Sequence, residues 1–97
     1  MSTFDEHTAA HLADLFATLG DSSRLRVIEC LLEGERSVGQ TAIQLGMSEP
    51  AVSHQLQRLR LMRLVRGRKV GRKIYYSLDD DHVSRLLLLG LDHILHG

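Results

Sequence analysis

The chain has 97 residues, 43% of them hydrophobic, and its 12 basic and 12 acidic side chains give a net charge of zero. This length fits one small domain, and the longest apolar run, Leu86 to Leu91, falls far short of the roughly 20 residues that a membrane-spanning helix needs. We therefore expect no membrane segment and no signal peptide. The single cysteine, Cys30, excludes an internal disulfide and is typical of a cytoplasmic protein.

The charge is divided unevenly along the chain. Residues 1–47 carry three Arg against seven Asp and Glu, which gives −4. Residues 78–97 carry one Arg against four Asp, which gives −3, and residues 48–77 carry eight Arg and Lys against one Glu, which gives +7. The basic charge is thus concentrated in one third of the chain, which predicts one surface for a polyanion and another for a different partner.

Helices are predicted from the N-terminus onward. Thr3 and Glu6 have the spacing of a capping box, and an Ala/Leu-rich helix follows that ends at about Gly20. Asp21 or Ser22 then caps a second helix, whose apolar residues recur with helical spacing.

Two further helices are predicted with a very short link between them. Ser37 caps the third helix, which stops at Gly46. Ser48 caps the fourth, at about 48–61, with Pro50 in the first turn where its missing N–H does no harm. A link of about three residues is the tight turn of a helix-turn-helix.

After Leu61 the apolar pattern changes from helical to strand-like. Two β-prone runs at about 64–78 flank Gly71-Arg72 and predict a hairpin. Asp79 or Asp80 caps a last helix at about 80–96. The order ααααββα predicts a mainly α fold of the winged helix-turn-helix type, as a single domain over 1–97.

The basic third has the features of a DNA-binding unit. In the fourth helix Val52, Leu56 and Leu59 are spaced to face the core, which leaves a polar outer surface for base edges in the major groove. The basic hairpin suits phosphates or the minor groove. Double-stranded DNA is favoured over RNA because no aromatic platform accompanies the charge. The predicted contacts are Ser48, Glu49, Ser53, His54, Gln55, Gln57 and Arg58 in the helix, and Arg66, Arg68, Lys69, Arg72 and Lys73 in the wing.

The last helix carries a stripe of metal-binding side chains. His82 and His93 are eleven residues apart, which is three turns plus about 20°, and His96 lies about 40° to the other side of His82. The rise of a helix puts His82 roughly 16 Å from His93, so one ion cannot bind both. Asp80 and His82 can share an ion at one end of the helix, and His93 and His96 can share one at the other.

Each of these pairs is half of a tetrahedral set. An antiparallel copy of the same helix would bring Asp80 and His82 of one chain beside His93 and His96 of the other. Twofold symmetry would make two equivalent sites, so the spacing predicts a homodimer with intersubunit metal sites, bound to twofold-symmetric DNA. Three imidazoles and a carboxylate favour Zn(II) or Co(II), and Ni(II) if further ligands join. Four ligands leave no open position for catalysis, so we expect no enzyme activity.

Over nearly its whole length the chain resembles the ArsR/SmtB family of metal-responsive repressors. The resemblance is carried by FATLGDSSRLRVIECLL, SEPAVSHQLQRLRLMRLV, GRKIYYSL and the motif D-x-H-x10-H-x2-H. In zinc-sensing members this last motif forms an intersubunit site on the C-terminal helix. It falls without a gap on Asp80, His82, His93 and His96.

The resemblance implies a mechanism. The first and last helices would form the dimer, and metal binding would weaken operator binding and so derepress metal efflux or homeostasis genes. His93 would donate a hydrogen bond to the backbone carbonyl near Arg63 and so couple the metal site to the DNA-binding unit.

Two alternatives stay open within the same fold. His7 and His11, spaced i, i+4 in the first helix, could supply extra ligands, as N-terminal groups do in some nickel or cobalt sensors that the chain resembles. The protein could also be a winged-helix repressor with a non-metal effector and a purely structural last helix. Thiolate sensing is disfavoured because Cys30 is alone and no cysteine lies near Ser37 to Gln40.

Overall fold

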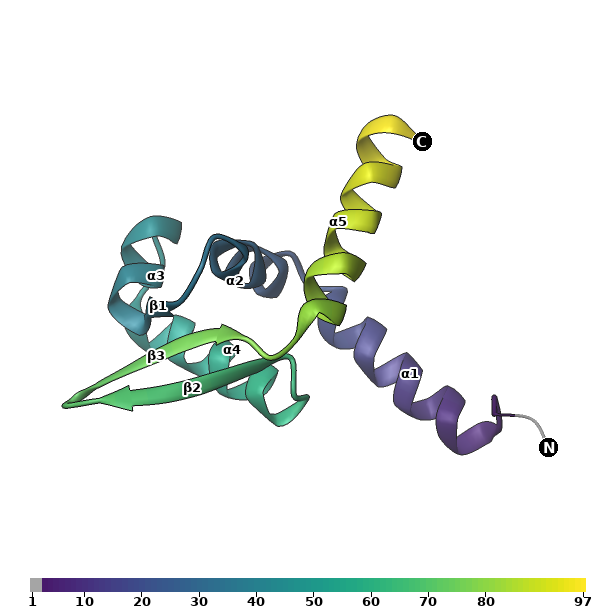
Figure 1. The fold of residues 1–97 in the computed structure, drawn as a ribbon, viewed down its shortest axis with the longest axis horizontal. Coiled ribbons are helices and arrows are strands. Elements are labelled where there is room, and N and C mark those ends of the chain that lie inside the picture. Colours follow the sequence, from purple (N-terminus) through teal and green to yellow (C-terminus); the bar gives the residue numbers. More distant parts are fainter. Residues whose placement is uncertain (1–2) are drawn as a thin grey trace.

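Helices and three short strands follow one another in the order predicted, with one strand added (Figure 1). The structure is a computed structural model that describes residues 3–97. Its elements are α1 (Glu6–Leu19), α2 (Ser22–Leu32), β1 (Arg36–Ser37), α3 (Val38–Leu45), α4 (Glu49–Leu61), β2 (Val65–Val70), β3 (Lys73–Leu78) and α5 (Asp81–His96).

Most predicted helix caps are confirmed. The Asp21 carboxylate accepts the backbone N–H of Arg24 at the start of α2. Ser37 and Gln40 form a reciprocal capping box at the start of α3, and Gly46 ends that helix with a φ of 65°, a left-handed conformation that favours glycine. Ser48 caps α4 through the backbone N–H of Ala51 at 3.2 Å. Because these caps fix α3 and α4 on either side of a short turn, the helix-turn-helix geometry is determined locally.

The predicted capping box at the first helix is wrong. The N-cap is Asp5, whose Oδ1 accepts the backbone N–H of Thr8 at 2.8 Å, so Glu6 lies inside the helix and Thr3 lies outside it. A carboxylate next to the free N–H groups of the first turn is the stronger acceptor, and Asp5 takes that place.

A two-residue strand that sequence analysis did not predict joins the wing to the body. The sheet order is β1-β3-β2, all antiparallel, with Arg36 opposite Tyr76 and Ser37 opposite Tyr75. The predicted hairpin is confirmed, with Val70 opposite Lys73 around Gly71. Two residues are too few to show an alternating pattern, and Ser37 immediately becomes the cap of α3, so the sequence offers no strand signal here.

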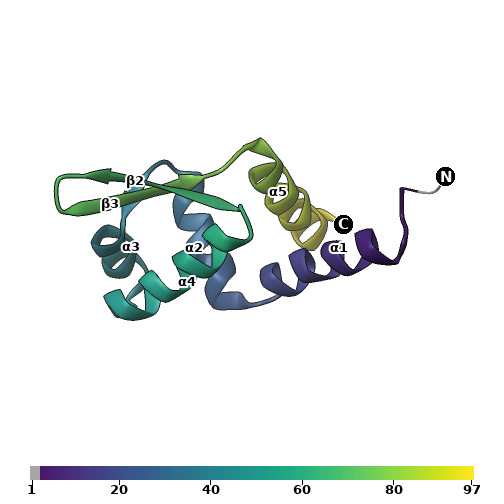
Figure 2. The ribbon, with the colours of Figure 1, turned by 90° about the horizontal axis from the view of Figure 1, so that it is seen from below.

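The core lies between α2, α3, α4 and the base of the sheet. Ile28, Val52, Leu56 and Leu59 are almost completely buried there. Among the described residues α1 contributes no buried side chain and α5 contributes only Val83. Both terminal helices project from the body in the two ribbon views (Figures 1 and 2). The radius of gyration, 14.5 Å, accordingly exceeds the about 13 Å expected of a compact domain of this size.

Candidate DNA-binding surface and metal ligands

Helix α4 presents a polar surface on the side away from the core. Val52, Leu56 and Leu59 point inward with 0% exposure, as predicted. The cap residue Ser48 is exposed, and so are four of the predicted contact residues within the helix: Glu49, His54, Gln57 and Arg58. Ser53 is half-buried and accepts a hydrogen bond from the Gln57 amide at 3.3 Å. This polar surface begins at the N-terminus of α4, where partial positive charge favours an approaching phosphate.

Gln55 is placed differently from the other polar residues of α4. Its Oε1 accepts a hydrogen bond from Nε of Arg24, on α2, at 3.2 Å, and the side chain is half-buried. The two residues are 31 positions apart, so only the tertiary structure could reveal the contact.

The wing carries an exposed row of cations, but one of them is paired. Arg66, Lys69, Arg72 and Lys73 are exposed. Arg68 donates two hydrogen bonds to the carboxylate of Glu35, at 2.6 and 3.1 Å. It also lies over the ring of Tyr75 at 5.9 Å.

The Glu35–Arg68 pair changes the titration of both groups. Hydrogen bonds from the Arg68 guanidinium hold the pKa of Glu35 below its usual value, and the carboxylate raises the pKa of Arg68. The planar guanidinium matches the carboxylate through two parallel bonds. Arg68 is therefore already occupied, whereas the other wing cations are available to a phosphate.

The two ends of α5 hold the four predicted metal ligands. Asp80 is the N-cap: its Oδ1 accepts the backbone N–H of His82 at 2.8 Å, and its Oδ2 lies 3.2 Å from Nδ1 of His82. His93 and His96 lie in the last turn and line one hollow with Leu86, Leu89 and Gly90. The structure thus brings the ligands together as two pairs, one at each end of the helix.

Neither pair is a complete metal site within one chain. The described residues contain no group of three or more His, Cys, Asp or Glu side chains placed to hold a metal ion. The intersubunit site therefore stays a prediction. Imidazole and carboxylate donors, without a thiolate, fit Zn(II) and Co(II).

An apolar hollow of about 430 Å³ lies where α1, α2 and α5 meet. Phe16 lines it from α1, Ile28 from α2, and Leu87 and Ile94 from α5. Ile94 is 79% exposed and Leu89 is 68% exposed. Exposed apolar side chains gathered on terminal helices are typical of a protein–protein contact surface.

Comparison with known proteins places this arrangement in a family. The sequence profile described as "Bacterial regulatory protein, arsR family" matches residues 21–66, which run from the cap of α2 to the start of β2. The chain is 46% identical over 86 residues to the "Transcriptional repressor SmtB homolog" of Synechocystis sp., covering 89% of this chain and 65% of that protein. It is 41% identical over 92 residues to the "HTH-type transcriptional regulator NmtR" of Mycobacterium tuberculosis, covering 95% and 77%.

The chain belongs to the arsR family of bacterial regulatory proteins. The chain is similar to a solved structure, the homodimeric winged helix-turn-helix DNA-binding domain of Mb0332 from Mycobacterium bovis. It superposes with a TM-score of 0.82 at 29% identity, and covers 100% of this chain and 96% of that one. The winged helix-turn-helix fold expected from the sequence is thereby confirmed. The arsR family consists of regulatory proteins, not enzymes, in agreement with the expectation from the sequence.

Of the remaining predicted residues, His7 and His11 lie side by side, whereas His93 and Arg63 do not contact each other through a hydrogen bond. The rings of His7 and His11 have centroids 4.3 Å apart on α1. His93 and Arg63 line different hollows, and the hydrogen bonds of residues 3–97 include none between them.

Cys30 is buried, and that burial raises the pKa of its thiol, which keeps it protonated. No helix within the described range is long and apolar enough to cross a lipid bilayer.

Sequence analysis missed three features of this site. Arg24 connects α2 with α4, Glu35 pairs with Arg68, and Arg63 has a φ of 58° in the turn after α4. The first two join positions more than 30 residues apart and leave no local signal. The left-handed conformation of Arg63 was missed because a glycine usually takes this position after a helix end.

Proposed function

We propose that this arsR-family protein is a homodimeric transcriptional repressor that binds twofold-symmetric operator DNA and is released when Zn(II) or Co(II) binds between the two α5 helices. The observation that carries the proposal is the position of the four ligands. Asp80 and His82 lie at one end of α5, and His93 and His96 at the other, on a helix that buries only Val83. The regulated genes would be those of metal efflux or homeostasis.

The dimer follows from the apolar surfaces of the terminal helices. Phe16 on α1 is 53% exposed and Leu89 on α5 is 68% exposed. Helical spacing places Leu89 on the same side of α5 as His82 and His93. In an antiparallel pair of α5 helices this leucine would pack against the partner helix, and the ligands of one chain would face those of its partner.

DNA binding is supported by the charge and by the free side chains of α4 and the wing. Residues 48–77 hold the net charge of +7 counted above, from eight Arg and Lys against one Glu. We propose that Ser48, Glu49, Ser53, His54, Gln57 and Arg58 face the major groove and that Arg66, Lys69, Arg72 and Lys73 face phosphates.

Metal would act by changing the equilibrium between dimer geometries. Ligands drawn from both chains favour a geometry in which the two α4 helices no longer match successive major grooves. His93 can contribute further by donating its second ring N–H to the backbone carbonyl near Arg63, since metal-bound histidines usually anchor that nitrogen.

The experiment is fluorescence anisotropy at fixed salt, with and without one Zn(II) per chain. The salt concentration is fixed because phosphate contacts make the affinity salt-dependent. The probe is the twofold duplex that binds most tightly when the protein selects from a randomised pool. We expect zinc to weaken binding about tenfold or more, which is about 1.4 kcal/mol of coupling. The His82→Ala variant should bind DNA equally with and without zinc. Unchanged DNA affinity under stoichiometric zinc binding would make the site structural.

The same experiment separates two other effectors. The first is a Ni(II) or Co(II) sensor in which α1 adds ligands, for which His7 and His11 are close enough to bind one ion, with ring centroids 4.3 Å apart. In that case Ni(II), not Zn(II), should release the DNA, and His7→Ala should abolish the response. A repressor with a non-metal effector would bind no metal stoichiometrically at α5.

A further inference from the structure

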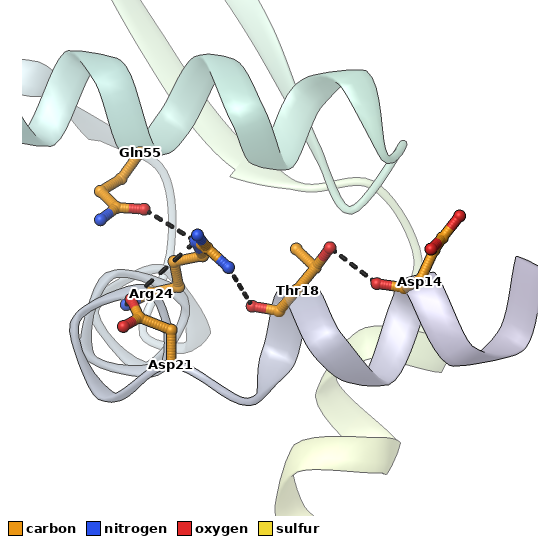
Figure 3. A network of polar contacts seen from close by, with 5 residues as sticks. All are labelled: Asp14, Thr18, Asp21, Arg24 and Gln55. Carbon is orange, nitrogen blue, oxygen red and sulfur yellow. Dashed lines mark hydrogen bonds and ion pairs between the residues drawn. The ribbon is translucent and has the colours of Figure 1, made fainter.

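Arg24 is the most enclosed charged side chain in the ion pairs of this protein, and it connects three elements. Only 16% of its side chain is exposed. Its Nε donates to Oε1 of Gln55 at 3.2 Å, and its Nη1 donates to the backbone carbonyl of Thr18 at 3.2 Å. The Asp21 carboxylate lies 3.9 Å away and balances the charge (Figure 3).

The two hydrogen-bond partners of Arg24 lie in two different helices. Thr18 is in the last turn of α1, where carbonyls have no partner within the helix, and Gln55 is in the middle of α4. Figure 3 shows the guanidinium between these two helices. Among residues 3–97 no other side chain is hydrogen-bonded to both α1 and α4. Arg24 is therefore the polar connection between the two helices.

Apolar packing does little to fix the same pair of helices. A hollow of about 500 Å³ lies between α1 and the end of α4, and His11, Asp14 and Leu15 line it opposite Leu61 and Met62. α1 packs mainly on α2. Because the apolar contact between α1 and α4 is loose, the two hydrogen bonds of the planar Arg24 guanidinium set the position of α4 relative to α1.

We propose that Arg24 and Gln55 are a positioning pair that fixes the recognition helix α4 relative to α1, and that Gln55 acts through Arg24 and does not read a base. The proposal rests on the proposed function, in which α1 belongs to the dimer interface. The position of α4 relative to α1 then sets the distance between the two α4 helices of the dimer. That distance must match half-sites about 34–36 Å apart on the DNA.

The test compares two duplexes at low, fixed salt. One is the full twofold duplex selected by the wild-type protein, and the other contains only one of its half-sites. We expect Arg24→Met and Gln55→Ala each to weaken binding to the full duplex about tenfold, as the loss of one charged hydrogen bond would. The double variant should lose no more than either single variant. Binding to the half-site should not change, because one α4 helix still docks normally.

Matched controls come from the same helices. Arg26, also on α2, donates to the Leu45 carbonyl of α3 at 3.4 Å and has no hydrogen bond to α4 within residues 3–97, so Arg26→Met should bind both duplexes like the wild type. Gln55→Glu keeps an oxygen for Arg24, so its ratio of full-duplex to half-site affinity should stay at the wild-type value. Circular dichroism checks that each variant is folded. If Arg24→Met does not fold, the half-buried Gln55→Ala and Gln55→Glu variants complete the test.

Three results would overturn the proposal. A loss of affinity for the half-site duplex would assign Arg24 and Gln55 to folding or to direct DNA contact. A loss in Gln55→Ala that depends on the base at a single position would make Gln55 a base reader. Unchanged binding to the full duplex would remove any positioning role. A wild-type protein that selects no duplex would instead reject the proposed function.

Discussion

Asp80 has two roles at the level of single residues. It caps α5 by accepting the backbone N–H of His82, and it is a proposed metal ligand. Asn is as good an N-cap as Asp, whereas Ala is poor. We therefore expect Asp80→Asn to keep the stability of the wild type and Asp80→Ala to lose about 1 kcal/mol. Both should lose metal affinity. Thermal unfolding of the metal-free variants and zinc titration measure the two effects separately, and an equally destabilised Asp80→Asn would contradict the capping role.

Glu35 gives the protein a stability term that depends on acidity. Its pKa is lowered in the folded state by the hydrogen bonds from Arg68, so the folded protein holds this proton less tightly than the unfolded chain does. The contribution is complete above the ordinary glutamate pKa and is lost as the pH falls through the lowered value. We expect Glu35→Gln to have a lower melting temperature near neutral pH, with a difference from the wild type that shrinks on acidification. Melting curves from neutral to acid pH, with Glu33→Gln as the control, test this, and a constant difference would speak against it.

The end of α4 is unusual at the level of elements. Arg63 follows the helix with a φ of 58°, a left-handed conformation that costs an L-residue roughly 1–2 kcal/mol. Glycine adopts this conformation freely, at the cost of more entropy in the unfolded chain. We expect Arg63→Gly to stabilise the protein by up to about 1 kcal/mol, whereas Arg63→Val should destabilise it. Chemical denaturation measures both, and a stability ranking in the opposite order would show that the Arg63 side chain outweighs the backbone strain.

The elements also show how far sequence alone predicts this fold. Ser37, Gln40, Gly46 and Ser48 act within a few residues of their own positions, so the boundaries of the helix-turn-helix could be read directly. The wing could be predicted because its turn and its two apolar runs are adjacent. β1 could not, because its two residues pair with Tyr75 and Tyr76, far along the chain.

The features of the candidate site also divide into those that the sequence predicts and those that only the tertiary structure reveals. The two proposed metal half-sites were predicted from the period of one helix, and in the structure Oδ2 of Asp80 lies 3.2 Å from Nδ1 of His82. The partners of Gln55 and Arg68 were not predictable, because Arg24 and Glu35 approach them only through the tertiary fold. In the sequence both residues are polar and lie outside the predicted core positions, so both looked free to contact DNA. Their geometry shows that each already has a partner.

At the level of the whole molecule, the projecting helices predict that the oligomeric state depends on α5. Ile94 is 79% exposed in the single chain, and burying an aspartate there in a dimer would be costly. We expect Ile94→Asp to be monomeric in sedimentation equilibrium at concentrations where the wild type is a dimer. Ile43→Asp on α3, where the isoleucine is 85% exposed, is the matched control and should remain dimeric. A dimeric Ile94→Asp would move the interface away from α5.

The double role of Asp80 has a consequence for how proteins of this kind diverge. A capping side chain at the start of α5 remains under selection in a lineage that no longer encounters the metal, because its loss would destabilise the first turn of the helix. The imidazoles of His93 and His96 have no such second duty, since neither ring makes a hydrogen bond within residues 3–97. Relatives that change their signal should therefore lose the C-terminal histidines first and keep a capping residue, such as Asp or Asn, at position 80. In a related sequence, the two histidines would then be the better indicator of metal sensing.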